Sequence, residues 1–292
     1  MATIENERFL VKIEDKGATL SSIFDKQHQE ELLWQPSLSN GKSWNNQDVV
    51  IFPLIGKLLD GYFVYKGKKF PFTSHGFARS SVFKSRQDDK SSVTHILTSN
   101  DETLKLYPFN FILSVTHTLN ARGIELTFKT INTGDNTMYF MLGSHPAISI
   151  PAQELVDCSN ILGNKLVFTQ QNTIQKKLDK SGAYCIGESE VSLSSIELSK
   201  KLFVDNGTII LQNVVGDIVL EKSNGRRVIF RNFNSDFVAI WSEAPYGAFV
   251  CVEPWWGSNE TLPINVEIEK KNYVKVLSPK QEYARSYSLD FE

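Results

Sequence analysis

The sequence predicts an all-β protein built as an antiparallel sandwich or barrel. Short runs with β-type alternation recur along the 292 residues, and turn signals separate them. Helical periodicity is nearly absent, and no helical segment reaches the length of a crossover between parallel strands. These observations together argue against an α/β fold.

The first four predicted strands cover residues 8–13, 18–24, 62–65 and 69–72. Two later pairs are typical of hairpins: residues 111–119 with 124–131, and residues 217–221 with 226–231. The turns between them contain Asn120 to Gly123 and Ser223 to Gly225. Asparagine and glycine suit such turns because both tolerate positive φ.

Two short helical segments are expected between the strands. The first covers residues 101–106, with Asp101 as its cap and Pro108 as its end, and the second lies within residues 194–203. No Pro/Ser-rich linker, low-complexity tract or exact repeat divides the chain. We therefore expect a single domain over residues 1–292.

Composition excludes several classes of partner. Thirty-three acidic and thirty-one basic residues give a formal net charge of -2, which provides no long-range attraction for nucleic acid or an anionic membrane. The N-terminal segment lacks the features of a secretory signal, so a cytoplasmic location is expected. Cys158, Cys185 and Cys251 form no CxxC pair, which argues against a disulfide framework and a structural zinc site.

Two of the five histidines lie where strands are expected to give way to loops. His75 stands before Gly76, and His145 stands before Pro146. Glycine permits close backbone approach and proline fixes φ, so both imidazoles could be held in a set direction. Turn histidines with satisfied hydrogen bonds are an equally open interpretation. His28, His95 and His117 are expected to be ordinary loop or strand histidines, and their spacing gives no metal motif.

The segment from Ala248 to Gly257 is the most unusual in the chain. An apolar strand is expected to end at Glu253, which Pro254, Trp255 and Trp256 follow. Partial burial would raise the pKa of this carboxyl group, and the indoles offer faces on which a sugar ring can stack. A strand-end glutamate beside core tryptophans is the competing interpretation. The commonest hydrolase, nucleotide and dinucleotide motifs are absent from the sequence.

The chain resembles the aldose 1-epimerase superfamily, especially its bacterial branch related to galactose mutarotase. Six short motifs carry the resemblance over nearly the whole chain, in the family's order: Leu33-Trp34, Ile51 to Lys57, His75 to Arg79, Tyr107 to Phe109, Gly143 to Pro146 and Cys251 to Trp255. The resemblance implies a galactose-mutarotase-like supersandwich of antiparallel sheets. It also implies that the chain interconverts the α and β anomers of an aldose.

By this resemblance, Glu253 matches the general base, His145 the general acid and His75 a second active-site histidine. Opening and reclosing of the sugar ring would need no cofactor and no metal. Trp34, Trp255, Lys57, Arg79 and Asp205 are the expected substrate-binding residues. Lys57 departs from the family's usual arginine, and the position of the sugar-binding aspartate falls between Asp205 and Asn206.

Three other functions stay open at this point. Lys57 and Arg79 could bind the phosphate of a hexose 6-phosphate, as in related 1-epimerases, although Arg79 could equally form a structural salt bridge. A non-catalytic sugar-binding protein could keep the same fold. A glycoside hydrolase would need a second carboxylate. The expected partner is a small sugar, and the expected assembly is a monomer or homodimer.

Overall fold

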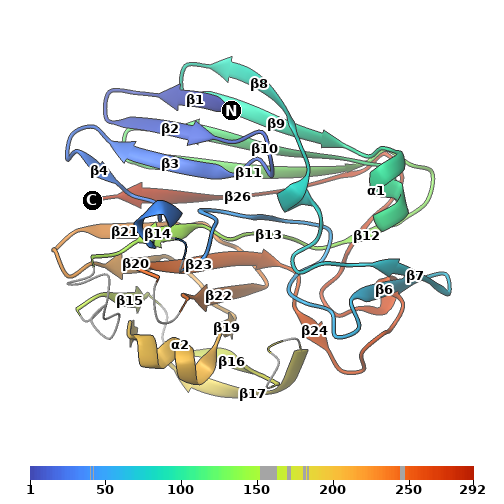
Figure 1. Cartoon of the computed structure of the whole chain (residues 1–292). Coiled ribbons are helices and arrows are strands. Elements are labelled where there is room, and N and C mark those ends of the chain that lie inside the picture. The colour runs from blue at the N-terminus through green and yellow to red at the C-terminus, as the bar shows by residue number, and fades with distance from the viewer. Residues whose placement is uncertain are drawn as a thin grey trace.

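Almost all regular structure in the chain is β-strand. The computed structural model describes residues 1–39, 41, 43–151, 163–169, 172–179, 182, 184–243 and 247–292. In this part, two large sheets lie one above the other, and three smaller sheets accompany them (Figure 1). The predicted all-β antiparallel fold is confirmed.

The first large sheet has nine strands, all paired antiparallel. Its order is β18 (Ser195–Glu197), β15 (Lys165–Phe168), β20 (Ile218–Glu221), β21 (Arg227–Arg231), β26 (Glu282–Phe291), β11 (Gly123–Asn132), β10 (Phe111–Leu119), β9 (Ser92–Thr98) and β8 (Lys84–Asp89). The C-terminal strand β26, red in Figure 1, lies between β21 and β11 and so joins the two halves of the sheet.

The second large sheet carries the candidate site. Its order is β24 (Glu260–Thr261), β17 (Tyr184–Ser192), β16 (Asn172–Leu178), β19 (Ile209–Gln212), β22 (Phe237–Trp241), β23 (Phe249–Trp256), β13 (Leu142–Ser144) and β5 (Val50–Ile51), with β14 (Ala147–Ser149) beside β23. The pair β17 and β24 is parallel, and the other pairs are antiparallel. Every residue of β23 is buried, which places its side chains in the interior.

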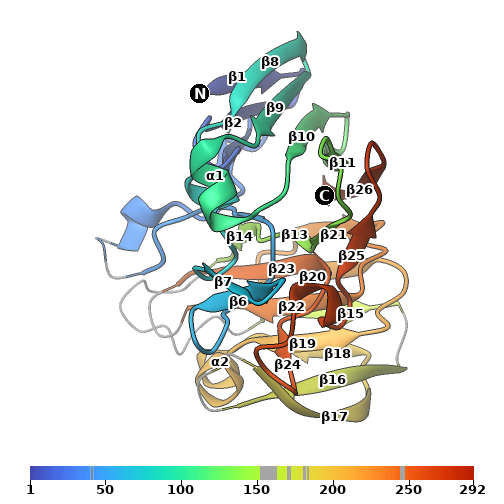
Figure 2. The ribbon, with the colours of Figure 1, turned by 90° about the vertical axis from the view of Figure 1, so that its right-hand side faces the viewer.

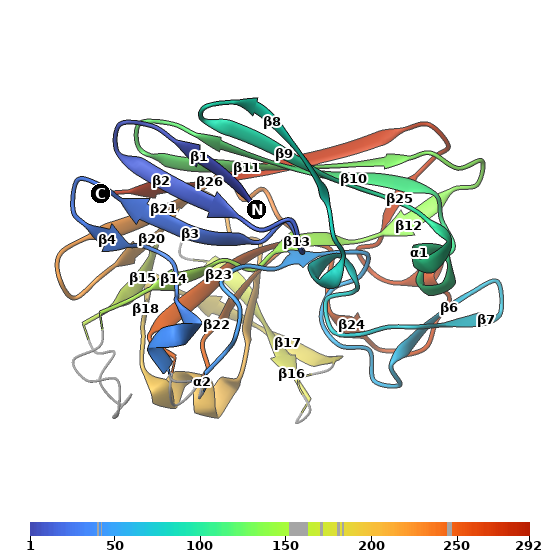
Figure 3. The same ribbon diagram turned by 45° about the horizontal axis from the view of Figure 1, so that its top comes forward.

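The smaller sheets lie at the periphery. One contains β1 (Ala2–Glu5), β2 (Phe9–Ile13), β3 (Leu20–Asp25) and β4 (Glu30–Glu31). A hairpin joins β6 (Tyr62–Tyr65) to β7 (Lys68–Pro71), and β12 (Met138–Phe140) pairs with β25 (Lys275–Leu277), which is remote in sequence. Figure 2 shows β6 and β7 beside β24, and Figure 3 shows β1 to β3 beside the first large sheet.

Alternation between buried and exposed positions explains how the large sheets pack. In β10, Phe111, Leu113 and Val115 are fully buried, while the residues between them are partly exposed. Phe128 of β11 contacts Trp256 of β23, with ring centroids 5.8 Å apart. The apolar core therefore lies between the first large sheet and β23.

Both predicted hairpins form. β10 and β11 pair from Phe111 opposite Asn132 to Leu119 opposite Ile124, and β20 pairs with β21 in the same antiparallel way. The predicted strand over residues 62–65 is β6, and the other early strands differ from prediction by one or two residues at their ends.

The short helices correct two predictions. Helix α1 (Asp101–Leu106) forms, but its cap is Asn100 rather than Asp101, because the Asn100 side chain accepts from the amides of Glu102 and Thr103. The second helical segment begins later than expected: residues 195–197 form β18, and α2 (Lys200–Asn206) follows with Ser199 as its cap. Three 3-10 turns complete the helical structure described: η1 (Pro36–Ser39), η2 (Ala78–Ser80) and η4 (Ile268–Lys270).

Two further sequence observations have structural counterparts. Cys185 and Cys251 are free thiols, whereas Cys158 lies outside the described residues. None of the helices described is long and apolar enough to cross a bilayer.

Candidate active site

A cavity of about 960 Å³ opens on the side of β23 that faces β16 and α2. Its walls come from distant parts of the chain: the segments after β5 and β7, the β13–β14 connection, β16, the end of α2, β22 and β23. Figures 1 and 2 both place α2 and β16 below β22 and β23. The volume is ample for a monosaccharide, because small-molecule sites commonly measure about 300–1,000 Å³.

His145 and Glu253 meet at the inner end of this cavity. Nε2 of His145 lies 3.2 Å from Oε1 of Glu253, and the Glu253 side chain is 1% exposed. Oε2 of Glu253 accepts a hydrogen bond of 3.0 Å from Nε1 of Trp255. The carboxylate therefore has one oxygen fixed by an indole and the other directed at an imidazole.

Burial controls the protonation of this pair. It raises the pKa of Glu253 well above its usual range, and the nearby charge of Asp48 raises it further against the opposing Trp255 hydrogen bond. Burial also lowers the pKa of His145 well below its usual range. Both shifts favour the neutral pair, with the proton on Glu253, and the 3.2 Å contact gives this proton a direct path to Nε2 of His145.

β23 does not end at Glu253 as the sequence suggested. The strand continues to Trp256, because Glu253 pairs with Ala239 and Trp255 pairs with Phe237 in the neighbouring strand β22. The carboxylate of Glu253 is therefore presented to the cavity from within the strand and not from its end. The alternation of the strand directs Glu253 and Trp255 to the same face.

A strained loop holds His75 in the wall. Its φ is +64°, and its backbone amide donates to the Gly56 carbonyl at 2.9 Å. A Cβ at the next residue, Gly76, would lie 2.1 Å from the Phe52 carbonyl oxygen, so glycine is required there. The His75 ring stands perpendicular to the His145 ring with centroids 5.6 Å apart.

His75 is neutral at physiological pH. Burial lowers its pKa to about 3, and the positive charges of Arg79 and Lys57 act in the same direction. The Gly56 amide donates to Nδ1 at 3.4 Å, so the ring hydrogen of the neutral imidazole is on Nε2. This tautomer makes Nε2 a hydrogen-bond donor.

Aromatic side chains surround the histidines. Trp44 packs on the His145 ring at 4.7 Å between centroids, and Trp241 meets the same ring edge-on at 5.6 Å. Both line the cavity together with Trp255. Trp44 and Trp241 were not predicted from the sequence, because neither lies beside a motif residue and only the fold brings them to His145.

Trp34 does not line the cavity. It is fully buried, packs on Phe249 at 5.1 Å, and donates from Nε1 to the carbonyl oxygen of Trp44. Trp34 was expected to contact the substrate, but it lies behind Trp44, which it supports through this hydrogen bond.

The expected polar binding residues all line the cavity. Lys57 and Arg79 form no ion pair with a carboxylate in the part of the chain that the structure describes, so the predicted alternative of a structural salt bridge for Arg79 is not observed there. Asp205 and Asn206 both contribute to the wall. Asp205 also forms an exposed ion pair with Lys201.

One group of donor atoms resembles a metal site. The described residues His145, Cys251 and Glu253 are buried, and their donor atoms lie within 4.8 Å of one another. A tetrahedral zinc ion requires donors only about 3.3–3.8 Å apart, given bonds of about 2.0–2.3 Å. Glu253 is also engaged by His145 and Trp255. This arrangement fits proton transfer more directly than metal binding.

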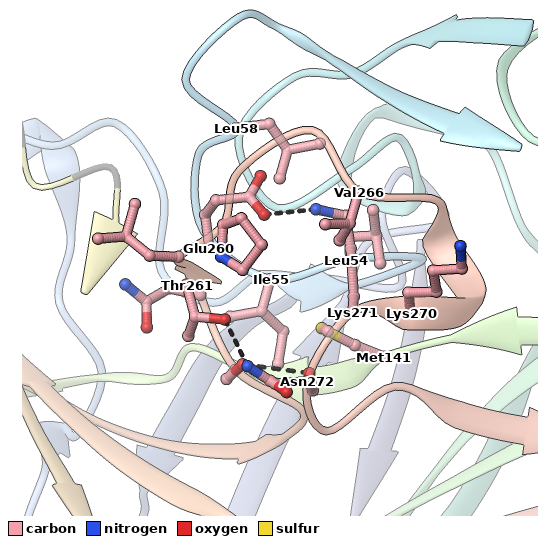
Figure 4. Close-up of a pocket in the computed structure, with 14 residues that line it drawn as sticks. Leu54, Ile55, Leu58, Met141, Glu260, Thr261, Val266, Lys270, Lys271 and Asn272 are labelled. Atoms are coloured by element: carbon pink, nitrogen blue, oxygen red, sulfur yellow. Dashed lines mark hydrogen bonds and ion pairs between the residues drawn. The ribbon is translucent and has the colours of Figure 1, made fainter. Parts of the chain in front are cut away.

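A second hollow of about 280 Å³ lies beyond Asn259, which borders both spaces. Figure 4 shows apolar side chains such as Leu58 and Val266 around it. Two of its three charged groups are paired with each other: Lys271 contacts Glu260 at 2.5 Å, and both are buried, whereas Lys270 is exposed. Because its polar groups are largely satisfied internally, the larger cavity is the stronger candidate for chemistry.

Comparison with known proteins agrees with this geometry. The family model described as aldose 1-epimerase matches residues 1–288. Protein LacX (plasmid) of Lactococcus lactis subsp. lactis is 29% identical over 301 residues, covering 98% of this chain and 97% of that protein.

Two solved structures share the fold throughout. A galactose mutarotase related enzyme from Lactobacillus acidophilus is 30% identical with a TM-score of 0.91, covering 100% of this chain and 97% of the other. A galactose mutarotase-like protein from Lactobacillus casei ATCC 334 is 25% identical with a TM-score of 0.90, and the match covers 100% of both chains.

Proposed function

The chain belongs to the aldose 1-epimerase family, and we propose that it is a mutarotase that interconverts the α and β anomers of an aldose such as galactose or glucose. The observation that carries this proposal is the 3.2 Å contact between His145 Nε2 and Glu253 Oε1 at the inner end of the cavity. Ring opening requires a base at the anomeric hydroxyl and an acid at the ring oxygen, and these two oxygens are bonded to the same carbon, so a base and an acid that lie close together suit the reaction. Galactose is proposed because the two similar solved structures are of a galactose mutarotase related enzyme and a galactose mutarotase-like protein.

The reaction begins when the shared proton is on His145. The Glu253 carboxylate takes the proton from the anomeric hydroxyl, the C1–O1 double bond forms, and the bond from C1 to the ring oxygen breaks. His145 delivers its proton to that ring oxygen. The product is the open-chain aldehyde, with Glu253 protonated and His145 neutral.

Rotation about C1–C2 then presents the other face of the aldehyde. The 5-hydroxyl attacks C1 and returns its proton to His145, while Glu253 returns its proton to the carbonyl oxygen. The protein ends in its starting state, so the residues account for every proton transferred. Each general acid or base contribution is worth roughly 10²- to 10⁴-fold.

Neighbouring side chains support this chemistry. His75 would donate from Nε2 to a substrate oxygen, and Trp44 would limit water around His145 because it packs on that ring. Lys57, Arg79 and Asp205 would contact sugar hydroxyl groups from the cavity wall. We also propose that the protein is cytoplasmic and that its cavity binds one sugar molecule.

A hexose 6-phosphate 1-epimerase is the second candidate. The observation that favours it is that Lys57 and Arg79 both face the cavity and have no carboxylate partner within the described residues. Two such cations could neutralise a phosphate dianion locally. Asp205 in the same wall favours an uncharged sugar instead.

The deciding experiment measures anomer exchange. Polarimetry of freshly dissolved α-D-galactose and α-D-glucose, and NMR exchange with the 6-phosphates, would be compared with and without the protein. Acceleration that is lost in Glu253→Gln supports the mutarotase. Sugar binding without acceleration of any of these sugars would contradict it and favour a binding protein.

A further inference from the structure

Asp48 is a buried acid directly behind the candidate active site. It lies two residues before β5, which begins at Val50, and it is 1% exposed. Oδ1 accepts hydrogen bonds from the backbone amides of Val49 at 2.7 Å and His145 at 3.2 Å. Asp48 therefore holds the backbone of a residue that contacts Glu253.

The same oxygen reaches a second part of the sandwich. Ser144 Oγ donates to Asp48 Oδ1 at 3.3 Å, and Ser144 Oγ lies 2.8 Å from the hydroxyl of Tyr287 in β26. These contacts link the end of β13, one residue before His145, to strand β26 of the first large sheet. The position of His145 is thus fixed from two sides.

These hydrogen bonds do not explain why the residue is an acid. These three converge on Oδ1, whereas Oδ2 is buried and has no partner within hydrogen-bond distance among the described residues; the backbone amide of Leu20 also favours the ionised carboxylate. An asparagine oxygen could accept the same three donors. Keeping a buried carboxylate has a free-energy cost, so the negative charge needs a separate explanation.

The charge of Asp48 acts on the catalytic pair. Burial raises the pKa of Asp48 to about 6, so the group is mostly ionised at neutral pH and above. Its negative charge raises the pKa of Glu253, and it acts in the same direction on Cys251 and Tyr287. A carboxylate whose pKa is raised by a neighbouring anion is a better proton acceptor.

We propose that Asp48 is a positioning residue of the active site, whose carboxylate fixes the loop that carries His145 and places a second negative charge behind Glu253. Its catalytic consequence rests on the proposed mutarotase function, but its electrostatic effect on Glu253 does not. The effect can therefore be measured without any sugar.

Other titratable or charged groups around Glu253, His145 and Asp48 set the background for this test. His145 and Cys251 lie beside Glu253, Tyr287 interacts with Asp48, and His75, Lys57 and Arg79 act on the two histidines. None of them is altered by Asp48→Asn, which keeps an oxygen for the three donors and replaces the buried Oδ2, with its charge, by a neutral NH2 group. Asp48→Ala removes both the charge and the hydrogen bonds. Comparison of the two variants therefore separates the electrostatic role from the positioning role.

The direct experiment follows the side-chain carboxyl ¹³C resonances of Glu253 and Asp48 from pH 4 to pH 9. In wild-type protein, Glu253 should respond to the ionisation of Asp48 near pH 6. In Asp48→Asn this response disappears, and Glu253 loses its proton at lower pH by at least about half a unit. Unchanged titration of Glu253 in Asp48→Asn, or no wild-type response to Asp48, overturns the proposal.

Kinetics provide the second arm. Asp48→Asn should move the acid limb of kcat/KM to lower pH in parallel with the NMR titration, while Asp48→Ala should also lower kcat by about tenfold because His145 is no longer fixed. A purely structural role predicts no pH shift in Asp48→Asn. If wild type accelerates no anomer exchange, the mutarotase proposal fails, and the NMR titration still decides the electrostatic role of Asp48.

Discussion

Nε2 of His145 lies 3.2 Å from Oε1 of Glu253, so a residue of the connection between β13 and β14 and a residue of β23 form a single proton-exchanging pair. This relationship determines the first prediction. Glu253→Gln keeps the shape of the side chain and an acceptor for Trp255, but removes the base. We expect turnover to fall by roughly 10²-fold or more with sugar binding largely kept. Polarimetry and calorimetric binding would measure the two quantities.

The second prediction concerns the pair as a unit. His145→Asn should also reduce turnover by roughly 10²-fold or more, and the double variant should cost little beyond either single change, because each change alone breaks the same proton exchange. Trp241→Phe is a suitable control, since it keeps an aromatic ring against His145. Losses that multiply in the double variant would mean that the residues act independently.

The third prediction separates the two candidate substrates. Lys57→Gln should lower kcat/KM for hexose 6-phosphates by about tenfold to a hundredfold if Lys57 binds phosphate, because a charge-assisted hydrogen bond is worth about 1.5–3 kcal/mol. Unphosphorylated sugars should be affected much less. Lys68→Gln, an exposed change in β7 away from the cavity, is the control. Equal losses with both classes of sugar would exclude a phosphate-binding role for Lys57.

The fourth prediction follows from a histidine outside the site. His117 is fully buried in β10, neither ring nitrogen has a partner within the described residues, and burial lowers its pKa to about 3. In the unfolded chain this histidine has a pKa of about 6.5. Below that pH the unfolded chain binds a proton at His117, whereas the folded protein keeps His117 neutral. The stability contribution is therefore fully present above pH about 6.5 and is lost as pH falls toward 3.

His117→Leu removes this acid sensitivity. The free energy of unfolding of wild type should fall by about 2 kcal/mol more than that of His117→Leu between pH 7.5 and pH 5. Urea unfolding at both pH values measures the difference. Thr130→Val is the matched control, because it removes another buried, unpartnered polar group that does not titrate. If the stability of wild type and His117→Leu had the same pH dependence, His117 would not be the source of the acid sensitivity.

The fifth prediction tests the buried ion pair beside the second hollow. Lys271→Met leaves Glu260 buried without its partner and should lower the free energy of unfolding by about 3–5 kcal/mol. Combining it with Glu260→Gln should recover much of the loss. Lys105→Met breaks the exposed pair with Glu102 and should cost less than about 1 kcal/mol. Similar costs for Lys271→Met and Lys105→Met would show that burial of the pair has little energetic effect.

Local patterns were sufficient for the early strands and the two hairpins that the sequence predicted, but many other strands were not predicted. The hairpin of β10 and β11 was predictable because alternation and a turn containing Gly123 act within a few residues of each other. The cap of α1 was misassigned because Asn100 and Asp101 are both good caps, and only the hydrogen bonds to Glu102 and Thr103 distinguish them. Strand β18 was missed because its pairing partner, β15, is remote in sequence.

The sequence by itself determined the fold class and brought attention to His75, His145 and Glu253, because strand alternation, turn residues and short motifs are local features. Only the tertiary structure decided that His145 meets Glu253, that Trp44 rather than Trp34 faces the cavity, and that Asp48 lies behind the pair. These relationships depend on how remote strands pack, and packing also sets the burial that shifts the pKa of each group. No local pattern encodes that burial.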